Sequence, residues 1–160
     1  MAEKNLKSLF EDTLRDIYYA ERQILKALPK MAKAANSEEL AQGFERHRQE
    51  TETHVERLEQ IFEMLDKRPR GKTCDAILGI IEEGKEVMEE YKDTVALDAG
   101  LTAAAQAVEH YEIARYGTLK SWAQRLGMKD AVRLLDQTLN EEKATDEKLT
   151  ALAEADAKAA

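Results

Sequence analysis

Apolar side chains recur every three or four positions along most of this chain, which is the spacing that one face of an α-helix requires. Short polar or Gly- and Pro-containing stretches interrupt the recurrence. These interruptions predict four long helices and one short helix, over about residues 4–35, 36–65, 74–91, 101–127 and 129–152. The last helix fades into an Ala-rich tail, about residues 154–160, which is expected to fray.

Several residues suit the ends of these helices. Asn36 is a favoured helix cap, and Glu39 stands where it would complete a capping box. Thr73 can cap the short helix, and Gly127 suits the left-handed position that ends a helix. Pro29 lies inside the first helix, where its missing N–H predicts a kink.

The lengths of the connections predict how the helices are arranged. The turns inside the first and the last pair of long helices are short, so each pair should form an antiparallel hairpin. Residues 66–97 can cross the whole bundle, since about 28 helical residues span roughly 40 Å. Two hairpins joined by one long crossover are the ferritin-like four-helix arrangement, and we expect it to form a single all-α domain over residues 1–160.

The two hairpins also resemble one another in sequence. At an offset of 91 residues (from position 21 to position 112), Glu21 matches Glu112 and the turn residue Asn36 matches Gly127. Apolar stripes of any two helices can be aligned by choice. The shared turn and the shared acid make this match more specific, and it indicates two related hairpins.

Acids interrupt the apolar stripes of the long helices near their midpoints. Glu21 stands among the apolar positions of the first helix, and Glu112 among those of the third. Glu142 lies one heptad from two leucines of the fourth helix, with Asp146 a turn further on. Antiparallel packing would bring these interruptions to one level of the bundle.

The second and third helices carry further polar residues near the same level. In the second helix His47 and His54 take central positions of the stripe, and Glu50 lies at its edge. In the third helix Glu109 lies at the edge of the apolar face, while His110 points almost opposite. His110 is most simply a surface or interface residue, and the roles of His47 and Glu109 stay open at this point.

Several carboxylates in one apolar core are unfavourable, because burial penalises each charge and like charges raise each other's pKa. Two divalent cations would offset this cost. Carboxylates and imidazoles on four facing helices form the di-iron or di-manganese centres of ferritin-like bundles. The sequence therefore predicts a dinuclear Fe or Mn centre with ligands among Glu21, Glu50, His54, Glu112, Glu142 and Asp146.

The same side chains could instead satisfy one another without metal. Arg115 could pair with Glu112, Glu50 with a neighbouring histidine, and Asp146 could hydrogen-bond Thr145. Such pairs explain one interrupted helix well. Four helices interrupted at matching depth favour a metal site.

Composition and charge limit the partners and the cellular compartment that the protein can have. The net charge of −8 disfavours a nucleic-acid partner, because phosphate backbones are bound by clustered Lys and Arg. Cys74 is the single cysteine, so no internal disulfide is possible, which fits a reducing compartment. No window approaches the roughly 20 apolar residues of a membrane span, and the N-terminus lacks the apolar region of a signal peptide. We therefore expect a soluble cytoplasmic protein with no membrane partner.

Five stretches carry a further resemblance: AERQ at 20–23, ALPKM at 27–31, ETETHVERLEQIF at 50–62, VEHYEIARYGTL at 108–119 and EEKATDEKLT at 141–150. They resemble the YciE/YciF family of bacterial stress-induced ferritin-like proteins, over about residues 5–153. The resemblance implies an all-helical ferritin-like fold, a homodimer and a structural relationship to rubrerythrin.

The ferritin-like pattern also implies roles for particular residues. Glu21 and Glu112 would be the single glutamates of the first and third helices, and Glu50 and Glu142 the acids of the second and fourth. The sequence departs from the usual Glu-x-x-His spacing, because Glu50 and His54 are four residues apart. The fourth helix has no histidine, so Asp146 or a water would complete that side.

These observations lead to one principal hypothesis and two alternatives. The principal hypothesis is a stress protein whose dinuclear iron or manganese centre reacts with oxygen or peroxide. The first alternative is a non-enzymatic helical protein that keeps the fold and uses the acids in a polar network. The second is an adaptor that binds partners through its acidic faces.

Overall fold

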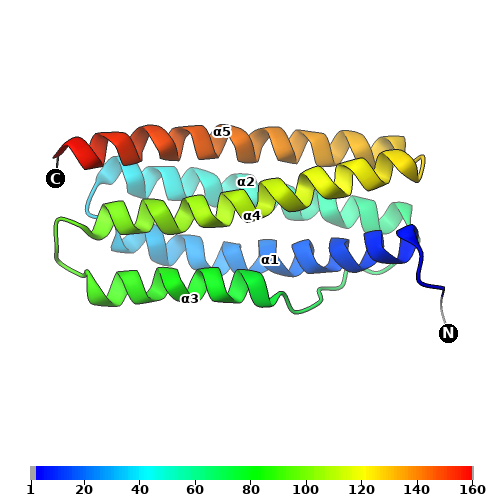
Figure 1. The fold of residues 1–160 in the computed structure, drawn as a ribbon, viewed down its shortest axis with the longest axis horizontal. Helices are drawn as coiled ribbons and strands as arrows, with labels where there is room; N and C mark the ends of the chain where they lie inside the picture. The colour runs from blue at the N-terminus through cyan, green and yellow to red at the C-terminus, as the bar shows by residue number, and fades with distance from the viewer. Residues whose placement is uncertain (1–2, 160) are drawn as a thin grey trace.

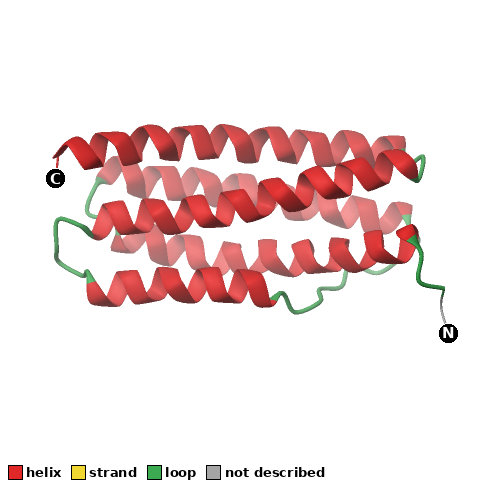
Figure 2. Cartoon of the chain, in the orientation of Figure 1, coloured by secondary structure: helices red, strands yellow, loops and turns green. Residues whose placement is uncertain are grey.

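A computed structural model describes residues 3–159, and every regular element in that range is an α-helix. The helices are α1 (Leu6–Ala34), α2 (Glu38–Met64), α3 (Asp75–Glu90), α4 (Leu97–Arg125) and α5 (Lys129–Ala159). α1 and α2 form one antiparallel hairpin and α4 and α5 the other, with α3 in the crossover (Figure 1). Figure 2 shows that short loops close each hairpin at an end of the bundle, whereas a longer loop runs from α2 to the start of α3 partway along it. The predicted all-α, ferritin-like arrangement is confirmed.

The four long helices enclose one apolar core along the bundle axis. Phe10, Leu14 and Ile17 from α1 are fully buried, as are Leu101 and Leu119 from α4. Each such side chain contributes roughly 1.5–3 kcal/mol relative to its exposed state. This apolar packing lies on both sides of the acidic level and fixes the four helices around it.

The turn between α1 and α2 is held by a carboxylate from the other hairpin. The backbone N–H groups of Asn36 and Ser37 each donate to Asp98 of α4, at 2.7 Å. The Asn36 side chain donates to the carbonyl of Thr94 at 3.1 Å, and Ser37 caps α2 instead. The predicted cap at Asn36 is therefore wrong, and with it the capping box through Glu39, because a long-range contact occupies the asparagine.

Other helix ends also differ from the pattern-based boundaries. Cys74, rather than Thr73, caps α3, and its sulfur accepts a backbone N–H at 3.4 Å. α1 continues through Pro29 to its end, and α5 continues to Ala159 because the tail is rich in helix-favouring residues. The prediction for Gly127 is confirmed, since it follows α4 in a left-handed conformation, with φ of +73°.

The crossover helix α3 packs against α1 and α4, outside the four-helix core (Figure 1). Gly100 of α4 permits this close approach. A Cβ atom there would lie 2.5 Å from Cγ1 of Val87, a distance that real side chains do not tolerate. Ile77 of α3 is fully buried in the resulting interface. In the part of the chain that the structure describes, no helix has the length and apolarity to span a membrane.

Candidate metal centre

Two groups of acids and histidines lie side by side at the middle of the bundle. The His47 group consists of His47, Glu109, Glu112 and Glu142, and the His54 group consists of Glu21, His54 and Glu142. Within each group, one ligand atom from every residue lies within 4.8 Å of the others. The residues come from all four long helices, and Glu142 belongs to both groups.

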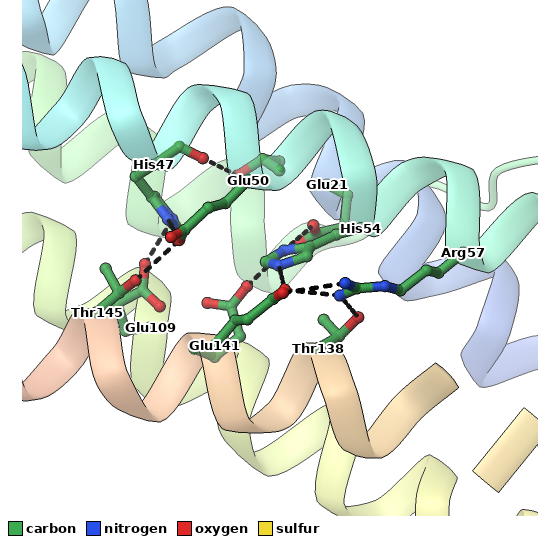
Figure 3. A network of polar contacts seen from close by, with 11 residues as sticks. Glu21, His47, Glu50, His54, Arg57, Glu109, Thr138, Glu141 and Thr145 are labelled. Atoms are coloured by element: carbon green, nitrogen blue, oxygen red, sulfur yellow. Dashed lines mark hydrogen bonds and ion pairs between the residues drawn. The ribbon is translucent and has the colours of Figure 1, made fainter. Parts of the chain in front are cut away.

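Carboxylates surround both ring nitrogens of His54 (Figure 3). Nδ1 lies 2.8 Å from Oε1 of Glu142 and 3.3 Å from Oε2 of Glu21. Nε2 lies 2.9 Å from Oε2 of Glu141, which in turn accepts hydrogen bonds of 2.6 and 3.0 Å from Arg57. His54 is therefore fixed from both sides, by the buried acids and by an ion pair nearer the surface.

His47 has fewer and less aligned partners. Its Nε2 lies 2.6 Å from Oε1 of Glu109, and its Nδ1 lies 3.7 Å from Oε2 of Glu50. Thr145 of α5 donates to the same Glu50 carboxylate at 3.2 Å (Figure 3). The Glu50 side chain is 39% exposed, so this contact leads from the buried group towards the surface.

Two pockets reach the His47 group from different sides. One, of about 250 Å³, lies between α1, α3 and α4 and has His47 and Glu109 among its lining residues. The other, of about 50 Å³, lies between α2, α4 and α5 and touches the same two residues together with Glu50 and Thr145. The smaller pocket therefore connects the half-exposed Glu50 with the buried pair His47 and Glu109.

The buried acids present an unusual concentration of unpaired polar atoms. Within the described residues, the carboxylate oxygens of Glu21, Glu112 and Glu142 are buried without a hydrogen bond of good geometry. Oε2 of Glu109 and the hydroxyl of Tyr116 share this state. One oxygen of Glu21 and one of Glu142 still approach the His54 ring. Proteins pair nearly all buried polar atoms, so oxygen atoms gathered in this way have the character of metal ligands.

The electrostatics of the metal-free site explain why it would favour cations. Burial raises the pKa of Glu21 to about 6, although His54 opposes the rise. Burial and the nearby charge of Glu142 raise the pKa of Glu109 well above its usual value. Burial lowers the pKa values of the two histidines, but the adjoining carboxylates outweigh it and raise them to about 10 for His47 and about 12 for His54. In the absence of metal, protons on the histidines and on the buried acids therefore offset the negative charge of the carboxylates, which bound metal ions would otherwise offset.

The structure brings four of the six predicted ligands together, namely Glu21, His54, Glu112 and Glu142. The other two, Glu50 and Asp146, lie outside the two groups. Glu50 contacts His47 and Thr145, as described above. Asp146 has Oδ1 3.2 Å from Nε2 of His110, whose side chain is 67% exposed.

Three residues with direct roles in the site were not among the predicted ligands. Glu109 is 1% exposed, and its position three residues before Glu112 already indicates the same helical face. His47 is central in its stripe, which is also a usable signal. Glu141 does not stand out in the apolar pattern of its helix, because its role depends on its contacts with His54 and Arg57 of α2. Arg115, the candidate partner of Glu112, lies instead over a tyrosine ring, 5.2 Å from its centre.

Four long helices, a crossover helix and a midpoint rich in carboxylates define a ferritin-like protein with a candidate metal centre. The chain belongs to the family described as "Domain of unknown function (DUF892)", which matches residues 5–160. It is 46% identical to protein YciF of Escherichia coli (strain K12) over 151 residues, which are 94% of this chain and 91% of that protein. The resemblance to the YciE/YciF family is therefore confirmed.

Solved structures agree with this assignment. The E. coli stress protein YciF superposes with a TM-score of 0.93 at 44% identity, covering 98% of this chain and 99% of that one. YcfI of Rhodopseudomonas palustris gives 0.89 at 52% identity, covering 92% and 94%. A protein of Xanthomonas campestris, at 22% identity and a TM-score of 0.72, is similar in fold alone.

Proposed function

We propose that this chain binds two iron or manganese ions, with the residues of the His47 group and the His54 group as their ligands. We further propose that this centre serves a stress response by reacting with oxygen or peroxide. The observation that carries the proposal is the set of buried carboxylate oxygens on Glu21, Glu112 and Glu142, which form no hydrogen bond of good geometry and of which only one each on Glu21 and Glu142 approaches His54. They lie within reach of two imidazoles, which is the mixed ligand set that iron and manganese favour in helical bundles.

The charges of the buried residues support two ions rather than one. Four buried carboxylates, those of Glu21, Glu109, Glu112 and Glu142, would balance the four positive charges of two divalent cations. Glu142 belongs to both groups, so it would bind both ions. Glu50 and Asp146 stay candidate ligands, and Glu50 is placed to receive an ion entering through the smaller pocket.

Two iron or manganese ions, when bound in the divalent state, would supply the electrons that oxygen or peroxide accepts. The protein's own residues would prepare the site for that chemistry. Glu141 and Arg57 hold the His54 ring in one orientation through its outer nitrogen. Before the ions bind, Glu109 can hold a proton at its Oε2, because burial raises its pKa, and it would release that proton when the ions bind. The Tyr116 ring packs edge-on against His54, with 6.4 Å between ring centres, and helps to exclude water.

Elemental analysis of protein purified without added metal, and again after anaerobic loading with iron or manganese, tests this proposal. We expect about two metals per chain, with most of the metal lost in Glu21→Ala and Glu112→Ala. The exposed Glu83 of α3 provides a control, since Glu83→Ala should retain both ions. Peroxide consumption by iron- and manganese-loaded protein then tests the reaction. No bound metal after anaerobic loading contradicts the proposal.

A specific observation favours a second candidate function, that of a metal-free helical protein. His54 already contacts three carboxylates, so charged histidines could neutralise part of the cluster without metal. A relative, YcfI, has been proposed to be a structural protein. This candidate predicts that the wild-type protein binds no more metal than Glu21→Ala does.

We further propose that the protein is a homodimer, as the resemblance to its family implies, and that it is cytoplasmic, as its single cysteine suggests. Sedimentation equilibrium would measure the oligomeric state directly. A mass of a single 18.1 kDa chain at all concentrations would contradict the dimer.

A further inference from the structure

The pocket of about 250 Å³ beneath α3 has a chemical character that the metal proposal does not explain. Its walls are apolar side chains from three helices, including Ile24, Leu28, Ile81, Met88 and Val108. The crossover helix roofs the groove between α1 and α4 and supplies part of this lining (Figure 1). A passage for ions and water would not need so many apolar side chains in its walls.

The two ends of the pocket differ in charge and exposure. Lys26 and Lys30 of α1 and Lys85 of α3 line the pocket and are exposed. Lys85 has an acidic neighbour, Glu82, at 3.7 Å, whereas within the described residues Lys26 and Lys30 form no ion pair. At the buried end the lining includes His47 and Glu109, which pair with one another at 2.6 Å. The mouth therefore carries unpaired positive charge, whereas the charged groups at the floor offset one another.

The volume sets the size of a suitable ligand. A dry apolar cavity of about 150 Å³ binds benzene, so 250 Å³ would hold roughly ten non-hydrogen atoms. Small residues line the wall between α3 and α4, where Gly84 faces Ala104 and an added Cβ would make ordinary van der Waals contact with the alanine methyl at 3.6 Å.

We propose that this pocket binds an unbranched carboxylate with a chain of about eight to ten carbons. The alkyl chain would fill the apolar pocket, and the carboxylate would remain at the mouth between Lys26 and Lys30. Lys26 and Lys30 at the rim are free to attract the head group, whereas His47 at the floor is already paired with Glu109, so this orientation is favoured. The site does not require a bound metal, and it places the end of the chain beside His47.

Methyl NMR of the metal-free protein, titrated with decanoate, locates the ligand. We expect the methyl signals of Met31 and Met88, which line the pocket, to shift in a saturable manner. The methyl groups of Met64 and Met128, which are outside this lining, should stay unchanged. Equal shifts at all four methionines, or none at Met31 and Met88, would overturn the proposal. Butanoate, whose chain leaves most of the pocket empty, should bind at least tenfold more weakly.

A matched pair of variants on α4 tests the pocket itself. Ala104 lines it, whereas its neighbour Ala103 is exposed and does not. Ala104→Phe should weaken decanoate binding at least tenfold by filling the space, and Ala103→Phe should change it less than twofold. Thermal unfolding of both variants checks that each is folded. Unchanged affinity in a folded Ala104→Phe protein would rule out this pocket.

A second pair tests the orientation. Lys26→Glu with Lys30→Glu should weaken decanoate about fivefold or more and leave neutral 1-decanol within twofold. Lys4→Glu with Lys7→Glu, the same charge change at exposed positions near the other end of α1, should leave both ligands unaffected. If the rim variant has no effect while metal loading tightens decanoate tenfold, the carboxylate points inward and the proposed orientation is wrong. Metal content, measured separately, keeps this result independent of the metal proposal.

Discussion

His54 and His47 lie on the same helix, two turns apart, yet their surroundings differ in a way that matters for chemistry. His54 is fully buried, and carboxylates contact both of its ring nitrogens. His47 touches Glu109 closely but borders both pockets and a half-exposed Glu50. One histidine is enclosed by ion pairs, and the other faces the routes from outside.

This difference suggests that the two groups have different roles in metal binding. An enclosed ligand with an oriented ring favours tight, slow-exchanging metal binding. A ligand beside two pockets favours access by ions and small molecules. Because Glu142 belongs to both groups, the two ions would not behave independently. The following predictions test the enclosed and the accessible group against one another.

Glu142→Gln has the largest expected effect. Its carboxylate is buried and belongs to both groups, so the neutral amide should weaken binding of both ions by more than a hundredfold. Isothermal titration calorimetry with the metal ion measures the change in affinity. Glu147→Gln, at an exposed position of the same helix, is the control. Loss of one ion with the other retained at full affinity would show that the two groups are separate sites.

The stability of metal-free protein should fall as the pH rises above 6.5. The raised pKa values of His47 (about 10) and His54 (about 12) mean that the folded state keeps protons which the unfolded state releases near pH 6.5. This stabilisation is complete below pH 6.5 and is lost towards pH 10 and above. The slope is at most about 1.4 kcal/mol per pH unit for each group. Denaturant unfolding at several pH values between 6.5 and 9.5 measures it.

Metal should reverse this slope, because ions bind the deprotonated ligands and displace the protons. In the metal-free state His47→Gln should flatten the slope, while His110→Gln should not, since the His110 side chain is 67% exposed. A metal-free protein that becomes more stable between pH 6.5 and 9.5 would contradict the assigned charge states.

Much of the site could be predicted because a buried acid disturbs a regular apolar pattern. Glu21, Glu112 and Glu142 each stand inside a stripe, and a stripe position is buried wherever the bundle forms. His54 follows from the same argument. The hairpin topology followed from the short turns and from the length of residues 66–97, since these limit which helices can be neighbours.

The remaining features depend on contacts between helices, which one helix cannot reveal. Glu109 occupies the edge of its face, and it is buried because His47 of α2 meets it there. Asp146 shares a face with Glu142 by spacing, yet its carboxylate lies near His110. The neighbouring helix therefore determines whether a residue at the edge of a helical face is buried in the site. Sequence spacing alone cannot tell such a buried residue from one that lies outside the site.

Chelation kinetics should distinguish the accessible group from the enclosed one. Excess EDTA should remove metal in two phases whose rates differ at least tenfold, the faster from the His47 group. His47→Ala should abolish the fast phase, and His54→Ala should abolish the slow one. Metal content after rapid desalting gives the rates. A single phase in wild-type protein would show that the pockets do not make the His47 group more accessible.

The smallest expected effect concerns the ion pair that encloses His54. Arg57 and Arg48 of α2 each donate three side-chain hydrogen bonds, but the Arg57 side chain is 15% exposed and the Arg48 side chain 28% exposed. Arg57→Ala leaves Glu141 as a charge supported by His54 alone, so it should destabilise the protein by about 1–2 kcal/mol. Arg48→Ala removes exposed pairs with Glu45 and Glu52, which solvent screens, and should destabilise the protein less than Arg57→Ala does.

Metal content sharpens the same comparison beyond stability. Arg57 supports the outer nitrogen of His54 only through Glu141, so Arg57→Ala should speed the slow phase of chelation several-fold without changing the fast phase. Arg48 has no contact with either group, and its loss should change neither phase. Equal effects of the two variants on stability and on both phases would mean that the ion pair is ordinary surface structure. The enclosure of His54 would then rest on the buried acids Glu21 and Glu142 alone.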